Sequence, residues 1–184
     1  MSKLPLSQSG ARYLLISILI VIIDQVCKYL CVTYIERGTM GISVTPFFNL
    51  VHVYNHGAAF SFLAEMGGWQ RWFFAGIAVV IGLCFVVLML RTPKSHRLTC
   101  TAFALFVGGA AGNLIDRVHL GYVIDFLLFY IKGDDFFWAY PAFNIADIAV
   151  CVGAALLILL SLFGKHEHDK KQEAKSKADG LPRV

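Results

Sequence analysis

The stretch GGAAGNLIDRVHLGYVIDFLLFYIKGDDFFWAYPAFNIAD, residues Gly108–Asp147, decides how this chain folds. It places carboxylates and amides inside sequence that is otherwise apolar enough for a lipid bilayer. The polar residues in or beside its hydrophobic runs are Asn113, Asp116, Arg117, Asp125, Asn144 and Asp147. One aspartate near the centre of a membrane helix costs about 2.5–3.5 kcal/mol on insertion scales. The default explanation for several polar groups in such a setting is a functional site.

The composition of the whole chain is that of an integral membrane protein. Of its 184 residues, 58% are hydrophobic and only 15% are charged, whereas soluble domains carry roughly 25% charged residues. The formal charge of +4 does not indicate a nucleic-acid partner, because many basic residues lie in one polar tail. These tail residues are Lys165, Lys170, Lys171, Lys175, Lys177 and Arg183.

The five cysteines do not form a recognisable framework. They are Cys27, Cys31, Cys84, Cys100 and Cys151. All lie in or at the edges of hydrophobic segments, and none belongs to a CxxC pair, so neither a disulfide framework nor a zinc site is indicated. We interpret them as buried free thiols that act as small hydrophobic side chains.

Four segments are long enough to cross about 30 Å of hydrocarbon, which takes roughly 20 helical residues. They run from about 12 to 33, 69 to 90, 98 to 115 and 140 to 163. We therefore expect a mainly α membrane protein, with a single four-span domain over residues 1–164. Residues 165–184 are charged and lack aromatic side chains, which predicts a disordered cytoplasmic tail.

The distribution of Lys and Arg predicts the orientation of the spans. The N-terminus carries Lys3 and Arg12, and the loop between the second and third spans carries three basic residues within 91–97. The segment 34–68 between the first two spans carries only Arg37. Both termini are therefore expected on the cytoplasmic side, and the two longer polar-aromatic segments on the opposite side.

The first of these outer segments has a composition that favours a small β-sheet. Val44–Tyr54 is rich in β-branched and aromatic residues, and Asn55–Gly57 is a turn signal. Ala58–Leu63 is apolar again and suits an interfacial helical turn. We expect a small extracytoplasmic β-cradle over about 38–63, followed by that interfacial segment.

Two groups of polar residues share a helix face by their spacing. Asp24 and Lys28 are four residues apart and can pair, either as a self-neutralising pair near the interface or as support for a site. Asn113, Asp116 and Arg117 also share a face, at the outer end of the third span. A capped helix end with an Asp116–Arg117 pair would explain two of these three residues but leaves Asn113 unexplained.

Asn144 and Asp147 form a further i, i+3 pair, in the fourth span. A helix that begins near Pro141 would place Asp147 roughly 9 Å along its axis. Asp125 lies in the apolar run Val123–Tyr130, which is too short to span a bilayer. We expect a membrane-surface or re-entrant segment that places Asp125 over the outer ends of the helices.

Two carboxylates in a low-dielectric site suit the chemistry of aspartic proteases. One stays protonated as a general acid, and the other acts as a base on water, without metal or cofactor. His52 and His56 have the spacing of metal ligands on a helix, but they fall in strand and turn sequence without HExxH. Ser61 lacks a GxSxG setting, which argues against a serine protease.

Four blocks of this sequence, in order along the chain, resemble the lipoprotein signal peptidase family, also called signal peptidase II. DQVCK at 24–28 is similar to the family's DQxxK, and NHGAAFSFL at 55–63 to its NxGAAFxxL. GNLIDRVHLGYVIDF at 112–126 resembles GNxIDRxxxGxVxDF, and FNIAD at 143–147 matches FNxAD. His56 departs from the family, since its position is often held by Pro.

The resemblance implies a four-span aspartyl peptidase of the bacterial inner membrane, with its site near the periplasmic face. Its substrate would be a diacylglyceryl-modified prolipoprotein, cut just before the lipidated cysteine. The family's catalytic pair maps onto Asp125 and Asp147. The substrate-binding or support residues map onto Asp24, Lys28, Asn55, Gly57, Asn113, Asp116, Arg117 and Asn144. We expect lipidated precursors and membrane lipids as partners, no nucleic acid, no metal or cofactor, and a monomer.

Two other functions remain as alternatives. A small proton-coupled transporter would use Asp24, Asp116 and Asp147 as a proton relay, but such folds carry internal repeats, and none is visible here. A non-catalytic lipid-binding subunit would tolerate the loss of Asp125.

Overall fold

The computed structural model describes residues 4–57 and 68–178. Its long helices are α1 (Leu14–Tyr34), α2 (Gln70–Arg91), α3 (Arg97–His119) and α4 (Ile145–Ala178). A short 3-10 turn, η1 (Gly10–Tyr13), precedes α1. Four helical segments are long and apolar enough to cross a membrane, as the sequence predicted. Their apolar residues point outward on many sides, which is the pattern of helices that face lipid.

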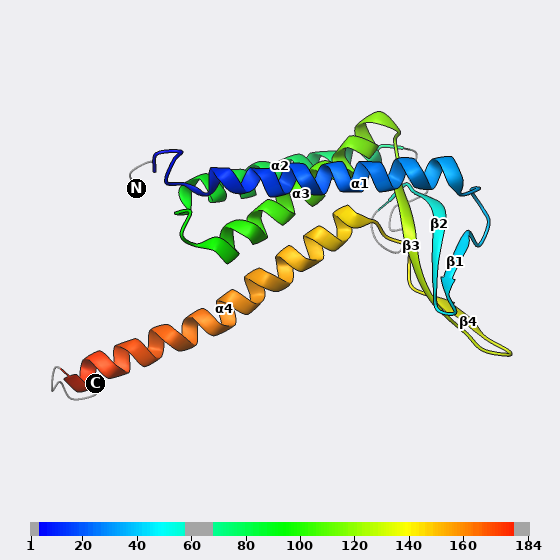
Figure 1. Cartoon of the computed structure of the whole chain (residues 1–184). Helices are drawn as coiled ribbons and strands as arrows, with labels where there is room; N and C mark the ends of the chain where they lie inside the picture. The colour runs from blue at the N-terminus through cyan, green and yellow to red at the C-terminus, as the bar shows by residue number, and fades with distance from the viewer. Residues whose placement is uncertain (1–3, 58–67, 179–184) are drawn as a thin grey trace.

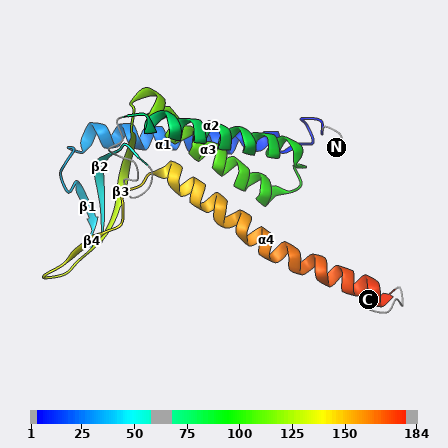
Figure 2. The ribbon, with the colours of Figure 1, turned by 180° about the vertical axis from the view of Figure 1, so that it is seen from behind.

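The helices α1, α2 and α3 run side by side, whereas α4 leaves the bundle at an angle (Figure 1). Both chain ends lie at one end of the bundle, and the strands lie at the other, also when the molecule is seen from behind (Figure 2). Helix α3 is central, since it contacts α1, α2 and α4. Four membrane crossings return the chain to its starting side, which agrees with this placement of the termini.

Small residues let α3 approach its neighbours closely. A Cβ on Gly108 would lie 2.9 Å from the Ile20 Cβ atom of α1. A Cβ on Gly112 would lie 2.7 Å from the carboxylate of Asp24 and 3.2 Å from the Cβ of Ala146. Close helix packing therefore depends on these positions, in the manner of small-residue interfaces in membranes.

An antiparallel four-stranded sheet covers the end of the bundle that is remote from the termini. Its order is β1 (Ile42–Thr45), β2 (Phe48–Asn55), β3 (Val123–Lys132) and β4 (Phe137–Ala139). The predicted cradle over about 38–63 is thus only half of the sheet, because β3 and β4 come from the chain between α3 and α4. The predicted interfacial turn at 58–63 lies outside the described residues.

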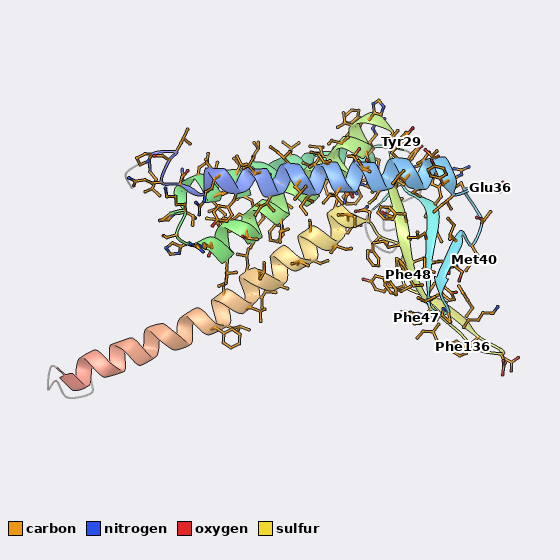
Figure 3. The ribbon with its side chains drawn as sticks, viewed as in Figure 1. Tyr29, Glu36, Met40, Phe47, Phe48 and Phe136 are labelled. Carbon is orange, nitrogen blue, oxygen red and sulfur yellow. The ribbon has the colours of Figure 1, made fainter. Side chains whose placement is uncertain are left out.

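The outer segments confirm one sequence-based expectation and differ from another. Val44–Tyr54 belongs to a small sheet, as expected, and a turn at 46–47 separates β1 from β2. Val123–Tyr130 is no re-entrant segment, because it pairs with β2 along its length, with a bulge between Leu50 and Val53. In Figure 3 the labelled side chains of Phe47 and Phe136 lie at the end of the sheet remote from the helices, and both are more than half exposed, at 56% and 57%.

Helix α4 begins later and ends later than the sequence suggested. It starts at Ile145, so the expectation of a start near Pro141 is wrong, and Asp147 lies in the first turn. The segment before it, around Phe143, is extended and hydrogen-bonded to β3 through Leu127. The helix also continues to Ala178, where we expected disorder; Lys, Gln, Glu and Ala are good helix formers, and no Gly or Pro interrupts residues 165–178.

All five cysteines are free thiols. Cys31 and Cys100 are buried, Cys27 is half-buried, and Cys84 and Cys151 are exposed on the helices. Our interpretation as buried thiols therefore holds for two of them, while the exposed thiols lie on apolar helices that suit contact with lipid.

Candidate functional site

The two predicted catalytic carboxylates come from different elements and meet at one cavity. Asp125 lies on the inner strand β3, opposite Val53 of β2, and Asp147 lies in the first turn of α4. The cavity has a volume of about 1020 Å³ and opens between the sheet and α4. Its lining includes the polar side chains of Tyr54, Asn55, His56, Asn113, Arg117, Asp125, Tyr140 and Asp147.

Asp125 is buried, and the side-chain amides of two asparagines donate hydrogen bonds to its carboxylate. It is only 2% exposed. The side-chain amide of Asn55 donates to Oδ2 at 2.9 Å, and that of Asn144 donates to Oδ1 at 2.7 Å. Burial, and then the nearby charge of Asp147, raises the pKa of Asp125 to about 7, although both amide donors act in the opposite direction. A proton therefore stays on this carboxyl more readily than on an ordinary aspartate.

Asp147 is fixed by the way in which α4 begins. Asn144 is the N-cap: its Oδ1 accepts from the backbone N–H of Asp147 at 3.0 Å. In return, Oδ2 of Asp147 accepts from the backbone N–H of Asn144 at 3.2 Å, so the two residues form a reciprocal capping box. The amide of Asn113 donates to Oδ1 of Asp147 at 2.7 Å. The i, i+3 spacing predicted this pair, but its cause is the helix cap.

Lys28 lies at the centre of the polar support. It is 2% exposed, and its ammonium lies 2.8 Å from carboxylate oxygens of both Asp24 and Asp116. The same nitrogen donates to Oδ1 of Asn113 at 3.1 Å. The predicted Asp24–Lys28 pair is therefore present, but it is not a simple interfacial pair, because it also holds α3. Asp116 pairs with Lys28, and the Asp116–Arg117 pair that we considered is not among the ion pairs of the described side chains.

This arrangement determines which way the amide of Asn113 faces. An ammonium can only donate hydrogen bonds, so the oxygen of Asn113 must face Lys28. Its NH₂ group is then directed at Asp147. Because Oδ1 of Asn113 also accepts from the amide of Asn144 at 3.1 Å, the orientations of both amides depend on one buried cation.

The support also connects four separate elements through backbone groups. Asp24 on α1 accepts from the backbone N–H of Ala146 in α4 at 2.9 Å. Asp116 on α3 accepts from the backbone N–H of Ile124 in β3 at 3.2 Å. Gln25 was not among the predicted site residues, yet its amide donates to Asp116 at 2.9 Å. A second polar residue beside Asp24 within an apolar span was the sequence signal for it.

Arg117 lines the cavity and contacts the backbone of Gly57. Arg117 donates to the carbonyl oxygen of Gly57 at 3.3 Å and to that of Asn113 at 3.4 Å, and its guanidinium lies 5.5 Å from the centre of the Phe74 ring. The backbone N–H of Gly57 donates to Oδ1 of Asn55 at 3.0 Å. This bond fixes the Asn55 amide so that its NH₂ group faces Asp125.

All eight predicted support residues therefore lie in this region. Asn55, Asn113 and Asn144 donate directly to the two carboxylates. The remaining five, Asp24, Lys28, Gly57, Asp116 and Arg117, act on these amides or on the elements that carry them. His52 lies in β2 and its Nδ1 is 3.0 Å from the carbonyl oxygen of Ile35, while His56 follows the same strand.

Comparisons with known proteins agree with this architecture. A model of the family described as signal peptidase (SPase) II matches residues 16–163. A lipoprotein signal peptidase of Yersinia enterocolitica is 48% identical over 158 residues, 86% of this chain and 90% of that protein. One of Alteromonas mediterranea is 46% identical over 93% of this chain and 91% of that protein.

A solved structure, described as a bacterial membrane enzyme, is also similar to this chain. It shares 32% sequence identity, with a TM-score of 0.71 over 84% of this chain and 90% of that one. With a family model that matches most of its length, the chain belongs to the signal peptidase II family, and it is a membrane-spanning peptidase.

Proposed function

We propose that this member of the signal peptidase II family is an intramembrane aspartic endopeptidase that acts on diacylglyceryl-modified prolipoproteins. It removes the signal peptide by cutting the bond before the lipidated cysteine, with Asp125 and Asp147 as its catalytic pair. The observation that carries this proposal is the pair itself: two carboxylates from separate elements line one cavity and share Asn144 as a neighbour. The names of the relatives supply the substrate class.

The different surroundings of the two carboxyls support different roles. Asp147 lies at the N-terminus of α4, where the helix dipole and the Asn144 N–H favour a negative charge. Asp125 has its pKa raised to about 7 by burial and by Asp147, which favours a proton on this carboxyl. Because like charges placed this close do not both ionise readily, the resting pair holds one shared proton.

The reaction follows from this distribution of protons. Asp147 takes a proton from a water molecule, whose oxygen attacks the carbonyl carbon of the scissile peptide bond. Asp125 gives its proton to the carbonyl oxygen, which forms a neutral tetrahedral diol. In the second step, Asp147 passes its proton to the departing nitrogen while Asp125 recovers a proton from a diol hydroxyl, and the C–N bond breaks. The pair returns to its initial state.

Arg117 and Asn55 are placed to bind the substrate beside this pair. Both line the cavity, and the guanidinium of Arg117 has five N–H donors, of which two are directed at Gly57 and Asn113. Its remaining donors bond to no other described residue and can reach carbonyl oxygens of the substrate backbone or of its ester-linked acyl chains.

The architecture supports a site on the side of the membrane opposite the termini. Arg12 lies in η1, and Arg91, Lys94 and Arg97 lie in or beside the connection between α2 and α3. η1 and this connection lie at the end of the bundle remote from the sheet (Figure 1), and residues of β2 and β3 line the cavity. By the positive-inside rule the termini are cytoplasmic and the cavity faces the periplasm. A substrate whose signal helix lies in the bilayer would present its scissile bond there.

The structure favours hydrolysis over proton-coupled transport. A relay through Asp24 and Asp116 would require these carboxylates to take up and release protons. Both lie 2.8 Å from the ammonium of Lys28, in ion pairs that a relay would have to break. Of the carboxylates that the structure describes, Asp125 and Asp147 are the two that line the cavity.

The deciding experiment is cleavage of a lipidated precursor by the purified protein. Asp125→Asn and Asp147→Asn should each lower turnover by about a thousandfold or more, since a general acid or base is lost. Asp134→Asn, on the exposed tip between β3 and β4, is the matched control and should cleave like the wild type. Mass spectrometry should find the cut before the lipidated cysteine, and the same peptide without acyl chains should remain intact. Turnover by either dyad variant would refute the assignment.

A further inference from the structure

A column of aromatic rings stands beside the site, on residues to which the catalytic proposal gives no role. The rings of Tyr54 and Tyr122 stack at 3.9 Å between centroids, with 22° between their planes. The His56 ring meets the Tyr122 ring edge-on at 5.4 Å. On the other side, the guanidinium of Arg37 lies 4.6 Å from the centre of the Tyr54 ring. The column joins the chain after α1, the end of β2 and the start of β3.

The column flanks the residue that donates to Asp125. Tyr54 and His56 come immediately before and after Asn55, and both contact Tyr122. Side chains alternate along an extended strand, so neighbours on either side of Asn55 point away from it. The amide of Asn55 accordingly reaches the opposite side and donates to Oδ2 of Asp125 at 2.9 Å.

Tyr122 itself is held in place by the end of α3. The N–H groups of Leu120 and Gly121 both donate to the carbonyl oxygen of Asp116, at 2.7 and 3.2 Å. Gly121 has a φ of 93°, a left-handed conformation that ends the helix and turns the chain into β3. A hydrogen bond with Tyr54 and burial raise the pKa of the Tyr122 hydroxyl, so this ring stays uncharged at neutral pH.

We propose that Tyr122 is a positioning residue: its ring packs against Tyr54 and His56 and thereby keeps the Asn55 amide within hydrogen-bonding distance of Asp125. This inference rests on the proposed function, because it concerns how the acid of the dyad is prepared. Asn55 is paired with Val123 at the last position of the β2–β3 ladder, where strand ends are free to separate. The stacked rings replace the strand pairing that ends there.

The proposal predicts a change at Asp125 that loss of stability alone would not produce. The hydrogen bond from Asn55 lowers the pKa of Asp125, against the larger effect of burial. If the column is removed, this bond weakens and the proton on Asp125 is held more tightly. The charged groups that face Asp125 are Asp147 from α4, Lys28 from α1 and Arg117 from α3, and the variants below leave all three in place.

The test compares Tyr122→Leu with Tyr122→Phe in the full-length protein, using a lipidated precursor peptide as substrate. Tyr122→Leu should lower kcat about tenfold, because the acid is less well placed. The midpoint of the pH–rate profile should move to higher pH by roughly half a unit, the size of one hydrogen bond. Tyr122→Phe keeps the stacked ring and should restore both quantities. Tyr130→Leu is the matched control, since Tyr130 stacks on Phe137 farther along β3, and it should behave as the wild type.

A double-mutant cycle with Asn55→Ala shows whether Tyr122 acts through Asn55. In the Asn55→Ala background, Tyr122→Leu should cause no further change in kcat or in the midpoint. Additive losses would overturn the proposal, as would a Tyr122→Leu enzyme with unchanged kcat and midpoint. If Tyr122→Leu does not fold, His56→Ala removes the contact between the exposed His56 ring and Tyr122 and should lower kcat about two- to threefold. Unchanged kinetics in His56→Ala would then overturn the proposal.

A titration that needs no turnover separates this inference from the proposed function. Carboxyl carbon NMR of the labelled protein, assigned with Asp125→Asn, gives the titration of Asp125 directly. A shift to higher pH in Tyr122→Leu, with Tyr122→Phe unchanged, supports the positioning role even if Asp125→Asn keeps its activity and the catalytic proposal fails. No shift overturns the positioning role, whatever the activity of Asp125→Asn.

Discussion

Asp24 and Asp116 lie 2.8 Å from the ammonium of Lys28, whereas Asp125 and Asp147 accept hydrogen bonds from amides. Asp24, Asp116 and Asp125 are buried, and Asp147 is partly buried beside them. The first group is neutralised largely by a cation, and the described ion pairs belong to it. The second group lies at a cavity, and among the described side chains it forms no ion pair.

The difference shows how one protein gives buried carboxylates opposite properties. A cation at hydrogen-bonding distance stabilises the charged form and makes a carboxylate a structural anchor. Neutral amides orient a carboxylate but leave its charge only partly compensated, so it can exchange a proton at neutral pH. The raised pKa of Asp125, about 7, is the consequence at the site.

The largest expected effect comes from removing the shared cation. Lys28→Met leaves two carboxylates buried without their partner, and breaking such a pair costs about 3–5 kcal/mol. Asp125→Asn should change the free energy of unfolding by less than about 2 kcal/mol. The variant weakens one hydrogen bond, but it no longer buries a second negative charge beside Asp147, and the two effects offset each other. Denaturant titration in mixed micelles measures both. Equal losses in the two variants would contradict the distinction between anchor and dyad.

A smaller effect tests how tightly the anchor is packed. Gly112→Ala would bring a Cβ within 2.7 Å of the Asp24 carboxylate, so we expect a loss of about 1–3 kcal/mol from overpacking. Gly76→Ala is the matched control on α2, where a Cβ has no neighbour within 4 Å. It should raise stability slightly, by about 0.5–1 kcal/mol, since Ala favours a helix over Gly. A Gly112→Ala protein as stable as the wild type would show that the anchor tolerates displacement.

Asn144 serves both as the cap of α4 and as a donor to the dyad, and two substitutions separate these roles. Asn144→Ala should cost about 1–2 kcal/mol of stability, as losses of a helix cap do. Asn144→Ser retains an acceptor for the N–H of Asp147 and should lose only a few tenths of a kcal/mol. Both lack the donor to Asp125, so both should lower kcat about tenfold or more. Wild-type turnover by Asn144→Ser would show that this amide does not support the acid.

The pH dependence of stability gives the most gradual effect, when it is expressed as the change in the free energy of unfolding per pH unit. The pKa of Asp125 is raised from 3.8 to about 7, so the native protein holds this proton more tightly than the unfolded chain. Stability should therefore be full below pH 3.8 and fall as pH rises through about 7, by at most about 1.4 kcal/mol per pH unit for one proton. Asp125→Asn should flatten this part of the curve. Thermal unfolding between pH 5 and 8 measures the difference, and parallel curves would contradict it.

The sequence predicted the parts of this fold that depend on local patterns. Four long apolar segments predicted four spans, and the spacing of Asp24 and Lys28 predicted their ion pair. Strand β3 was missed because it is buried on both faces over Val123–Phe126. A continuous apolar run shows no alternation, so periodicity cannot identify it as a strand.

The start of α4 illustrates two competing local signals. Pro141 is a favoured first residue of a helix, whereas Asn144 and Asp147 have the spacing of a capping box. The box prevailed because the chain around Phe143 is already hydrogen-bonded to β3, and a helix there would break that pairing.

By itself the sequence determined the membrane class, the number of spans and the residue types available for chemistry, because hydrophobicity and spacing are properties of single segments. The tertiary structure alone decided that Lys28 serves Asp116 as well as Asp24, and that Asn113 and Asn144 face the dyad. It also decided that a strand carries one of the two proposed catalytic carboxyls and the first turn of a helix the other. These contacts join α1, α3, β3 and α4. Burial where the four elements meet, together with the partners found there, determines how readily each carboxylate is charged. No single segment encodes that environment.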